Sequence, residues 1–162
     1  MSKQDIPTTQ AVRVLRAKQI EFTPHFYAYE ERGGTRLSAE SLGVPEHAVI
    51  KTIVLETQEK KPLICLMHGD QEISTKNLAR FLGVKGVVPC EPATAGKHTG
   101  YMVGGTSPFG TTKILPVYVE SSILNLERIY INGGKRGFLV EMNPRDISQA
   151  IDVTEVNVAI TN

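Results

Sequence analysis

The stretch Val49-Ile-Lys-Thr-Ile-Val-Leu-Glu56 predicts the strongest β-strand of this chain, and the expected fold is built outward from it. A second apolar segment, Leu63–His68, is compact enough for a buried strand. Strand alternation places Lys51 on the same, more apolar face as Ile53 and Leu55. Because buried lysines are uncommon, parity alone favours a lysine that extends to solvent at the strand end. If Lys51 instead points into a cleft, its ammonium can hold a phosphate, a carboxylate or an ester oxygen.

Short helices and further strands flank these two segments. Capping residues, prolines and glycines delimit the expected helices: one after Thr8 or Thr9 that carries Ala11, Val12 and Leu15, then Ala39–Leu42 behind Ser38, Thr75–Leu82, Pro92 to about Gly96, and one after Asn143-Pro144. The remaining expected strands are Phe22–Tyr29, Val87–Cys90, Ile114–Glu120, and a hairpin of Arg128–Asn132 and Gly137–Met142 around Gly133-Gly134.

The mixture of strands and short helices decides the expected fold class. The regular long crossover helices of a doubly wound sheet do not appear in the pattern. We therefore expect an α/β protein: a single mixed domain with a curved, barrel-like central β-sheet surrounded by short helices. The 162 residues amount to one ordinary domain, whose core is expected at about residues 8–150.

Composition and charge exclude several classes of protein. With 41% hydrophobic and 22% charged residues, the chain resembles soluble globular proteins rather than disordered ones. The 18 basic and 17 acidic residues exclude a broad basic surface for nucleic acid, although not a few contacts to one RNA end. Cys65 and Cys90 form no C-x-x-C pair, which favours reduced thiols in the cytosol. No signal peptide or membrane-spanning run is evident, so we expect a cytoplasmic protein without a membrane partner.

Two glycine-rich segments are the strongest indication of a binding site. They are Gly100-Tyr-Met-Val-Gly-Gly-Thr-Ser-Pro-Phe-Gly110 and Ile131-Asn-Gly-Gly-Lys-Arg-Gly137. Glycine allows positive φ and close approach of the backbone to a ligand, so such loops favour an anionic or carbonyl-bearing substrate. The first segment imitates a P-loop, but Thr111 stands where the phosphate-binding lysine belongs, which excludes nucleotide hydrolysis. Ordinary turns remain the alternative for both segments, with Lys135 and Arg136 either solvated or contacting an RNA phosphate.

No catalytic nucleophile or metal site stands out in the sequence. The four histidines share no metal-ligand spacing, and we expect neither metal nor cofactor. The absence of G-x-S-x-G argues against a hydrolase with a nucleophile elbow. A nucleophilic pair of Cys90 with a histidine stays open, although buried inert thiols are commoner. Pattern alone therefore leads to a ligand-binding α/β domain.

Taken together, the strand Val49–Leu55 and the two glycine-rich segments closely resemble the YbaK family. These proteins are free-standing aminoacyl-tRNA editing domains related to the editing insertion of bacterial prolyl-tRNA synthetases. The resemblance runs from about Thr8 to the helix after Asn143. It implies deacylation of mischarged tRNA, most of all Cys-tRNA(Pro), with the substrate's own thiol attacking its ester. The implied partners are the acceptor end of mischarged tRNA and prolyl-tRNA synthetase, without DNA or a cofactor.

The resemblance also assigns roles to individual residues. Lys51 matches the functionally important lysine of the family, which holds the terminal adenosine region or polarises the ester. Gly104 and Gly105 match the loop that cradles the ester end and complete the catalytic set. The substrate-binding residues implied by the resemblance are Tyr27, Ser107, Asn132, Gly133, Gly134, Lys135 and Arg136.

Two positions depart from the cysteine-specific pattern of that family. Asn132 replaces a serine and Leu139 replaces an aspartate, and leucine cannot donate or accept a hydrogen bond. The amino acid edited and the thiol-cyclisation route are therefore open, with water-mediated hydrolysis as the other route. Two further hypotheses remain: a non-catalytic module that binds tRNA or a synthetase, and a thiol-dependent hydrolase that uses Cys90.

Overall fold

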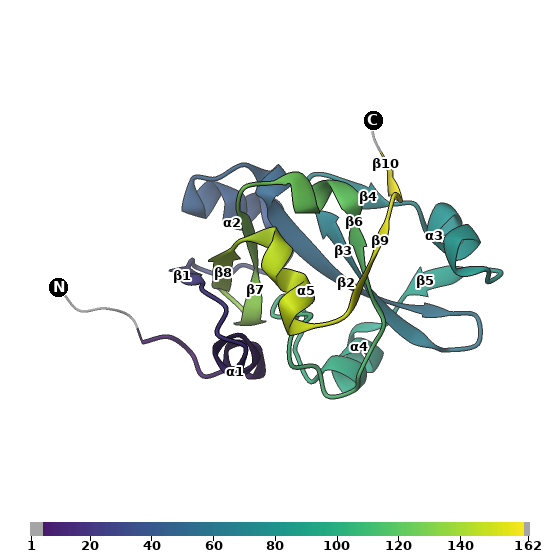
Figure 1. Cartoon of the computed structure of the whole chain (residues 1–162), viewed down its shortest axis with the longest axis horizontal. Helices are drawn as coiled ribbons and strands as arrows, with labels where there is room; N and C mark the ends of the chain where they lie inside the picture. The colour runs from purple at the N-terminus through teal and green to yellow at the C-terminus, as the bar shows by residue number, and fades with distance from the viewer. Residues whose placement is uncertain (1–4, 161–162) are drawn as a thin grey trace.

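The computed structural model describes residues 5–160, and its central element is the long strand β2 (Figure 1). One mixed sheet runs in the order β1-β8-β7-β2-β3-β6-β9, and β5 pairs with β2 off this path. A separate two-stranded sheet joins β4 to β10. The strands are β1 Thr23–Phe26, β2 Val49–Thr57, β3 Pro62–His68, β4 Glu72–Ile73, β5 Val87–Pro89, β6 Val117–Glu120, β7 Ile129–Lys135, β8 Phe138–Met142, β9 Val153–Val156 and β10 Ala159–Ile160.

The prediction of a mixed α/β domain around one large sheet is confirmed. Within residues 5–160, the outer strands β1 and β9 do not pair with each other, so the sheet stays open rather than closing into a barrel. Short helices surround it (Figure 1). They are α1 Gln10–Ala17, α2 Gly34–Leu42, α3 Thr75–Leu82, α4 Pro92–Thr99 and α5 Ile147–Ala150, with 3₁₀ turns at Glu46–Ala48, Ser121–Asn125 and Pro144–Asp146.

The helices begin at the predicted residues where a side chain forms the N-terminal capping hydrogen bond. The Thr9 hydroxyl accepts the Val12 N–H at 3.1 Å to begin α1, and Ser74 caps α3 in the same way. Gly83 then ends α3 in the left-handed conformation, as predicted. The helical segment predicted after Asn143-Pro144 is also confirmed: the Asn143 side chain caps the 3₁₀ turn Pro144–Asp146, which continues into α5.

Two predicted helix boundaries are wrong. Helix α2 begins at Gly34 rather than behind Ser38, whose hydroxyl bonds the carbonyl oxygens of Gly34 and Thr35 inside the helix. Helix α4 passes through Gly96 and ends at Gly100, which has φ 81°. Helix α2 thus begins before a local start signal, and α4 continues past a local stop signal.

The hairpin of β7 and β8 also differs from the prediction. Its turn lies at Arg136-Gly137, whereas Gly133 and Gly134 lie within β7 at a register shift between Asn132 and Lys135. The Asn132 Oδ1 accepts the N–H groups of Gly134 and Lys135 at 2.7 and 3.1 Å, which shapes this bulge. Strands β1 and β6 are shorter than predicted, beginning at Thr23 and Val117.

The core lies on both faces of β2 and determines where the sheet is left uncovered. Ile50 and Val54 point into the largest apolar cluster, with α1 and strands β6–β8. On the opposite face, Val49 packs with α2 and Leu55 packs with α3. Lys51 and Ile53 lie between these two helices on that face. None of the helices in the described part of the chain has the length and apolar character needed to cross a bilayer.

Candidate functional site

A cleft of about 420 Å³ lies over the uncovered middle of β2. Its floor is the strand itself, and its walls come from the segment that leads into α2, from the start of α4, from the loop at residues 103–106 and from the β7–β8 pair. The residues that line it are Tyr27, Tyr29, Glu30, Arg32, Gly34, Thr35, Leu37, Ser38, Val49–Val54, Pro89, Cys90, Pro92, Ala95, Val103, Gly104, Thr106, Asn132 and Leu139.

Lys51 extends along the cleft wall, with only 19% of its side chain exposed. The Lys51 side chain therefore points into a cleft, whereas strand alternation alone favours a lysine that extends to solvent. Its Nζ lies 3.5 Å from Oε1 of Glu72, whose side chain is 82% exposed. Ion pairs with so exposed a partner contribute only about 0–1 kcal/mol, so the ammonium can transfer to a ligand oxygen at little cost.

The loop at residues 102–106 brings its main chain to the cleft. The Gly105 N–H donates to the Met102 carbonyl at 2.8 Å, which closes a tight turn and occupies that donor. Gly104 has φ 86°, and a Cβ there would lie 2.5 Å from the hydroxyl of Tyr29. A Cβ on Gly105 would lie 2.8 Å from the Arg136 nitrogen. Both glycines are therefore required by close packing, and Gly104 is the one on the cleft wall.

Two side chains from the second glycine-rich segment hold this loop in place. The Asn132 amide donates to the Gly104 carbonyl at 3.0 Å, and Arg136 Nε donates to the Val103 carbonyl at 2.7 Å. The Arg136 guanidinium also stacks 4.9 Å from the centre of the Tyr29 ring. The loop is thus fixed by neutral and charged hydrogen bonds at consecutive carbonyls, which preorganises the cleft wall.

The structure does not bring all the predicted site residues to the cleft. Lys51, Gly104, Tyr27 and Asn132 line it together. Ser107 does not: it is fully buried, and its hydroxyl accepts the Phe109 N–H at 3.1 Å. The other predicted residues away from the lining are Gly105 and Gly133–Arg136, with Gly133 packed on Phe138, Gly134 packed on Tyr101, and Lys135 exposed to solvent.

The cleft wall on the side of α2 is mostly apolar, and the Tyr27 hydroxyl lies at the edge of this wall. Leu139 is 4% exposed and packs with Ala39 and Val49. Burial raises the pKa of the Tyr27 hydroxyl, and the neighbouring Tyr29 adds to the shift. Near neutral pH the Tyr27 phenol is therefore a protonated hydrogen-bond donor beside an apolar surface.

Cys90 lies on the cleft wall, but its environment disfavours a nucleophile. Burial, reinforced by the negative charge of Glu56, raises the pKa of the Cys90 thiol to about 11. Near pH 7 only about one molecule in ten thousand carries the thiolate. Among the described residues, no histidine hydrogen-bonds to this thiol, and no group of three His, Cys, Asp or Glu could hold a metal ion. The geometry thus argues against the thiol-dependent hydrolase.

Several cleft residues were not predicted from the sequence. The aromatic run Phe22–Tyr29 includes Tyr29, but Thr35 and Leu37 lie in the first turn of α2, before the start that Ser38 predicts. The sequence does not indicate the role of Thr52, because its surroundings depend on the pairing of β2 with distant segments of the chain.

Residues 34–150 match the model of a family described as the aminoacyl-tRNA editing domain. The chain belongs to this family. The matched range includes the β2 floor, the loop at 102–106 and the β7–β8 pair. It thus includes Lys51, Gly104 and Asn132, although Tyr27 precedes it.

Individual relatives agree with the family assignment. An Enterococcus faecalis protein named "Putative Cys-tRNA(Pro)/Cys-tRNA(Cys) deacylase EbsC" is 30% identical over 140 residues, covering 86% of this chain and 85% of the relative. A proline–tRNA ligase of Thermodesulfovibrio yellowstonii is 27% identical over 138 residues, which cover 84% of this chain but only 22% of the ligase. The fold also matches a solved structure described as a "putative trans-editing enzyme for prolyl tRNA synthetase", with TM-score 0.83, 17% identity, and coverage of 98% of this chain and 100% of the other.

Proposed function

We propose that this editing domain acts in trans as a deacylase that cleaves the aminoacyl ester of mischarged tRNA, with Cys-tRNA(Pro) as its first substrate. The observation that carries the proposal is the cleft itself. The Lys51 side chain and the Gly104 main chain both line this largely apolar cleft. The named deacylase relative from Enterococcus faecalis supports the same activity.

In this proposal the protein binds and polarises the ester and supplies no nucleophile. The Lys51 ammonium leaves Glu72 and contacts an oxygen of the ester or of the terminal adenosine. The Gly104 segment, fixed by Asn132 and Arg136, packs against the ester end. Because the binding groups are fixed before the substrate arrives, little reorganisation is needed when negative charge develops on the carbonyl oxygen.

The attacking group comes from the substrate or from water. In the thiol route the cysteine sulfur bonds to the carbonyl carbon, the ester bond breaks, and the tRNA hydroxyl regains a proton as a cyclic thiolactone leaves. In the water route the products are the free amino acid and the same tRNA hydroxyl. The buried Leu139 offers the thiol no hydrogen bond, and it suits small apolar side chains as well as cysteine. The released product therefore distinguishes the two routes.

A panel of aminoacyl-tRNAs tests the proposal. Purified protein is incubated with tRNA(Pro) carrying cysteine, alanine, serine or proline and with Cys-tRNA(Cys), and ester loss and product are measured. We expect loss of the cysteine ester from tRNA(Pro) and survival of the proline ester. If no panel member loses its ester, the protein is better described as a non-catalytic module that binds tRNA or a synthetase.

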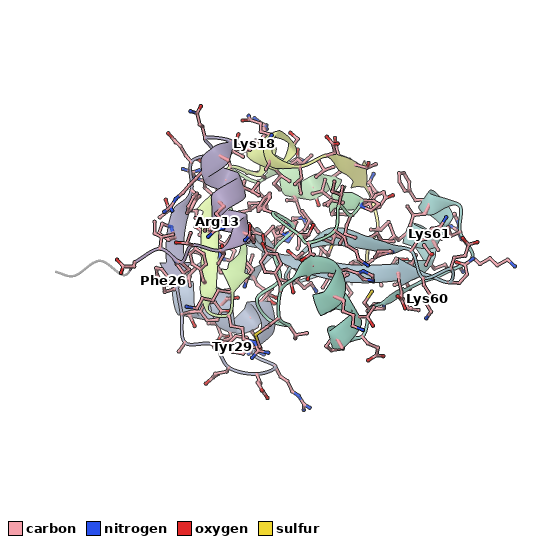
Figure 2. All side chains as sticks on the ribbon, turned by 90° about the horizontal axis from the view of Figure 1, so that it is seen from below. Arg13, Lys18, Phe26, Tyr29, Lys60 and Lys61 are labelled. Carbon is pink, nitrogen blue, oxygen red and sulfur yellow. The ribbon has the colours of Figure 1, made fainter. Side chains whose placement is uncertain are left out.

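Lys51→Ala is the variant that tests the site within this panel. It should fold normally and lose deacylation, because no other lysine lines the cleft in the described residues. Lys61→Ala is the matched control, since Lys61 lies at the far tip of the β2–β3 hairpin, at the opposite end of the molecule from Tyr29 (Figure 2). An undiminished rate in folded Lys51→Ala would remove Lys51 from the proposed mechanism.

We also propose that prolyl-tRNA synthetase delivers the substrate. The near-neutral charge of the chain, 18 basic against 17 acidic residues, favours weak tRNA binding by this domain alone. A partner that already holds the tRNA raises the local substrate concentration. Adding the synthetase should therefore increase the rate at low tRNA concentration, and an unchanged rate would contradict delivery.

A further inference from the structure

The edge of β2 that faces the cleft is paired at both ends and open in the middle. The parallel pairing with β7 ends at Ile50, which lies opposite Ile131. The antiparallel pairing with β5 begins at Leu55, which lies opposite Pro89. The other edge of β2 is paired with β3 without a break from Ile50 to Glu56. One edge of the strand therefore has a gap, and the gap is at the cleft floor.

Alternation of the backbone identifies the residue whose peptide groups face this gap. The Val54 carbonyl points toward β5, because it accepts the Cys90 N–H at 2.9 Å. The N–H and C=O of one residue point to the same edge of a strand, and the edge alternates from residue to residue. Thr52 therefore directs both its N–H and its C=O into the gap, whereas Lys51 and Ile53 direct theirs toward β3.

The side chain of Thr52 is also without a partner. Its Oγ1 is buried and makes no hydrogen bond with the described residues. Buried polar groups are nearly always paired, and strand edges are normally paired, covered or solvated. Pro92 cannot fill the gap from the start of α4, because proline has no N–H to donate. Thr52 is thus a polar position on the wall of an otherwise largely apolar cleft.

We propose that the aminoacyl group of the substrate fills this gap as a one-residue strand. An aminoacyl ester carries an α-ammonium and a carbonyl on either side of one carbon, with the same spacing as the N–H and C=O of a residue in a strand. Its ammonium donates to the Thr52 carbonyl and its ester carbonyl accepts the Thr52 N–H, as in a hydrogen-bonded antiparallel pair. This inference rests on the proposed deacylase function and deepens it.

The arrangement recognises what all aminoacyl esters share and leaves the side chain to the pocket walls. The Thr52 N–H withdraws electron density from the same carbonyl that the nucleophile attacks. The pairing requires a free α-amino group, so a peptidyl or other N-acylated ester fits less well than an aminoacyl ester. Recognition through the main chain also means that no side chain of this strand signals the role in the sequence.

The first test changes the substrate. A tRNA carrying the 2-hydroxy acid in place of the amino acid keeps the ester but replaces the ammonium with a neutral hydroxyl. We expect its kcat/KM to fall roughly ten- to hundred-fold against the aminoacyl ester, because a charge-assisted hydrogen bond is weakened. If wild-type protein cleaves both esters equally, this inference fails and the deacylase proposal stands. If it cleaves neither, the deacylase proposal itself fails.

The second test changes the protein. Thr52→Pro removes an N–H that no strand uses, and proline is tolerated at open strand edges, so the fold should survive. Its kcat/KM should fall roughly ten-fold or more, whereas Thr52→Ala, which keeps the peptide group, should lose much less. Equal losses in the two folded variants would contradict recognition by the main chain.

Amide hydrogen exchange provides a measurement that needs no variant. In the free protein the Thr52 amide should exchange faster than those of Lys51 and Ile53, which pair with β3. A saturating amide analogue of aminoacylated adenosine, which is not an ester, should then slow Thr52 selectively. A Thr52 amide already as protected as its neighbours, or one unaffected by the analogue, would overturn the inference.

Discussion

The two glycine-rich segments have similar composition but different positions relative to the cleft. In the first, Gly104 lies on the cleft wall and presents its main chain there. In the second, Gly133 and Gly134 pack against Phe138 and Tyr101 behind the loop. Both segments need glycine because another chain element approaches closely. Of these three glycines only Gly104 lines the cleft, so position rather than glycine content separates the binding loop from its support.

Among substitutions in the two glycine-rich segments, Gly104→Ala should cause the largest loss of activity. A Cβ at this position overlaps the Tyr29 ring, and φ 86° is strained for alanine, so the loop must move. We expect deacylation to fall by roughly a hundred-fold, because small displacements of positioning groups have effects of this size. Gly86→Ala is the control, since a Cβ there meets no atom within 4 Å. Equal activity in the two variants would show that the loop at residues 102–106 does not position the substrate.

Arg136→Lys should have the next largest effect. Lysine keeps the charge but loses the planar stacking on Tyr29 and the directed bond to the Val103 carbonyl. We expect kcat/KM to fall by roughly ten-fold, with kcat affected more than substrate affinity. Lys135→Ala separates loop support from RNA contact, because Lys135 is exposed and it is its backbone, which alanine keeps, that lies against Gly105. A loss of tRNA affinity in Lys135→Ala, with Arg136→Lys fully active, would favour the RNA-phosphate role instead.

Gly133→Ala should lower stability and leave catalysis in the folded protein nearly intact. The added Cβ would overlap the ring of Phe138, which is almost fully buried. Overpacking of this kind costs about 1–3 kcal/mol of unfolding free energy, measurable by denaturant titration. An activity loss per folded molecule as large as that of Gly104→Ala would show that the second segment also acts directly in the cleft.

Cys90→Ser should change activity least. The raised pKa of about 11 keeps the thiol protonated, so wild type and variant should have the same pH–rate profile near neutrality. A thiol whose pKa is raised by folding loses stability as pH rises from its ordinary pKa toward the folded value. The unfolding free energy of wild type should therefore decline between about pH 9 and about pH 11, less steeply in Cys90→Ser. If alkylation abolishes the activity of the wild type but not that of Cys90→Ser, the result would support Cys90 as a catalytic nucleophile.

Local signals in the sequence predicted the elements that depend on local bonds. Ser74 and Gly83 delimit α3, and the apolar stretch from Val49 defines β2. The position of Lys51 in a cleft came from family resemblance, whereas strand parity favoured solvent. Parity describes the face of a strand but not what covers that face, which here depends on α2 and α3.

The gap in β2 shows what the sequence could not provide. It arises because β7 and β5, about 40 residues apart in the chain, end on the same edge of β2 without meeting. No residue type in β2 marks such a gap, since Thr52 is an ordinary strand residue. The bulge at Asn132 is a similar case: in the sequence the glycines of β7 look like a hairpin tip, whereas in the structure they pack against Phe138 and Tyr101 within the strand.

A crystal structure of the protein with the amide analogue of aminoacylated adenosine would show directly how the aminoacyl group lies in the cleft. We expect the aminoacyl group on the floor of the cleft, with its carbonyl beside Lys51 and Gly104 and its amino group at the Thr52 carbonyl. An analogue bound elsewhere on the protein, or in the cleft with its carbonyl directed away from Lys51 and Gly104, would contradict the proposed role of the cleft.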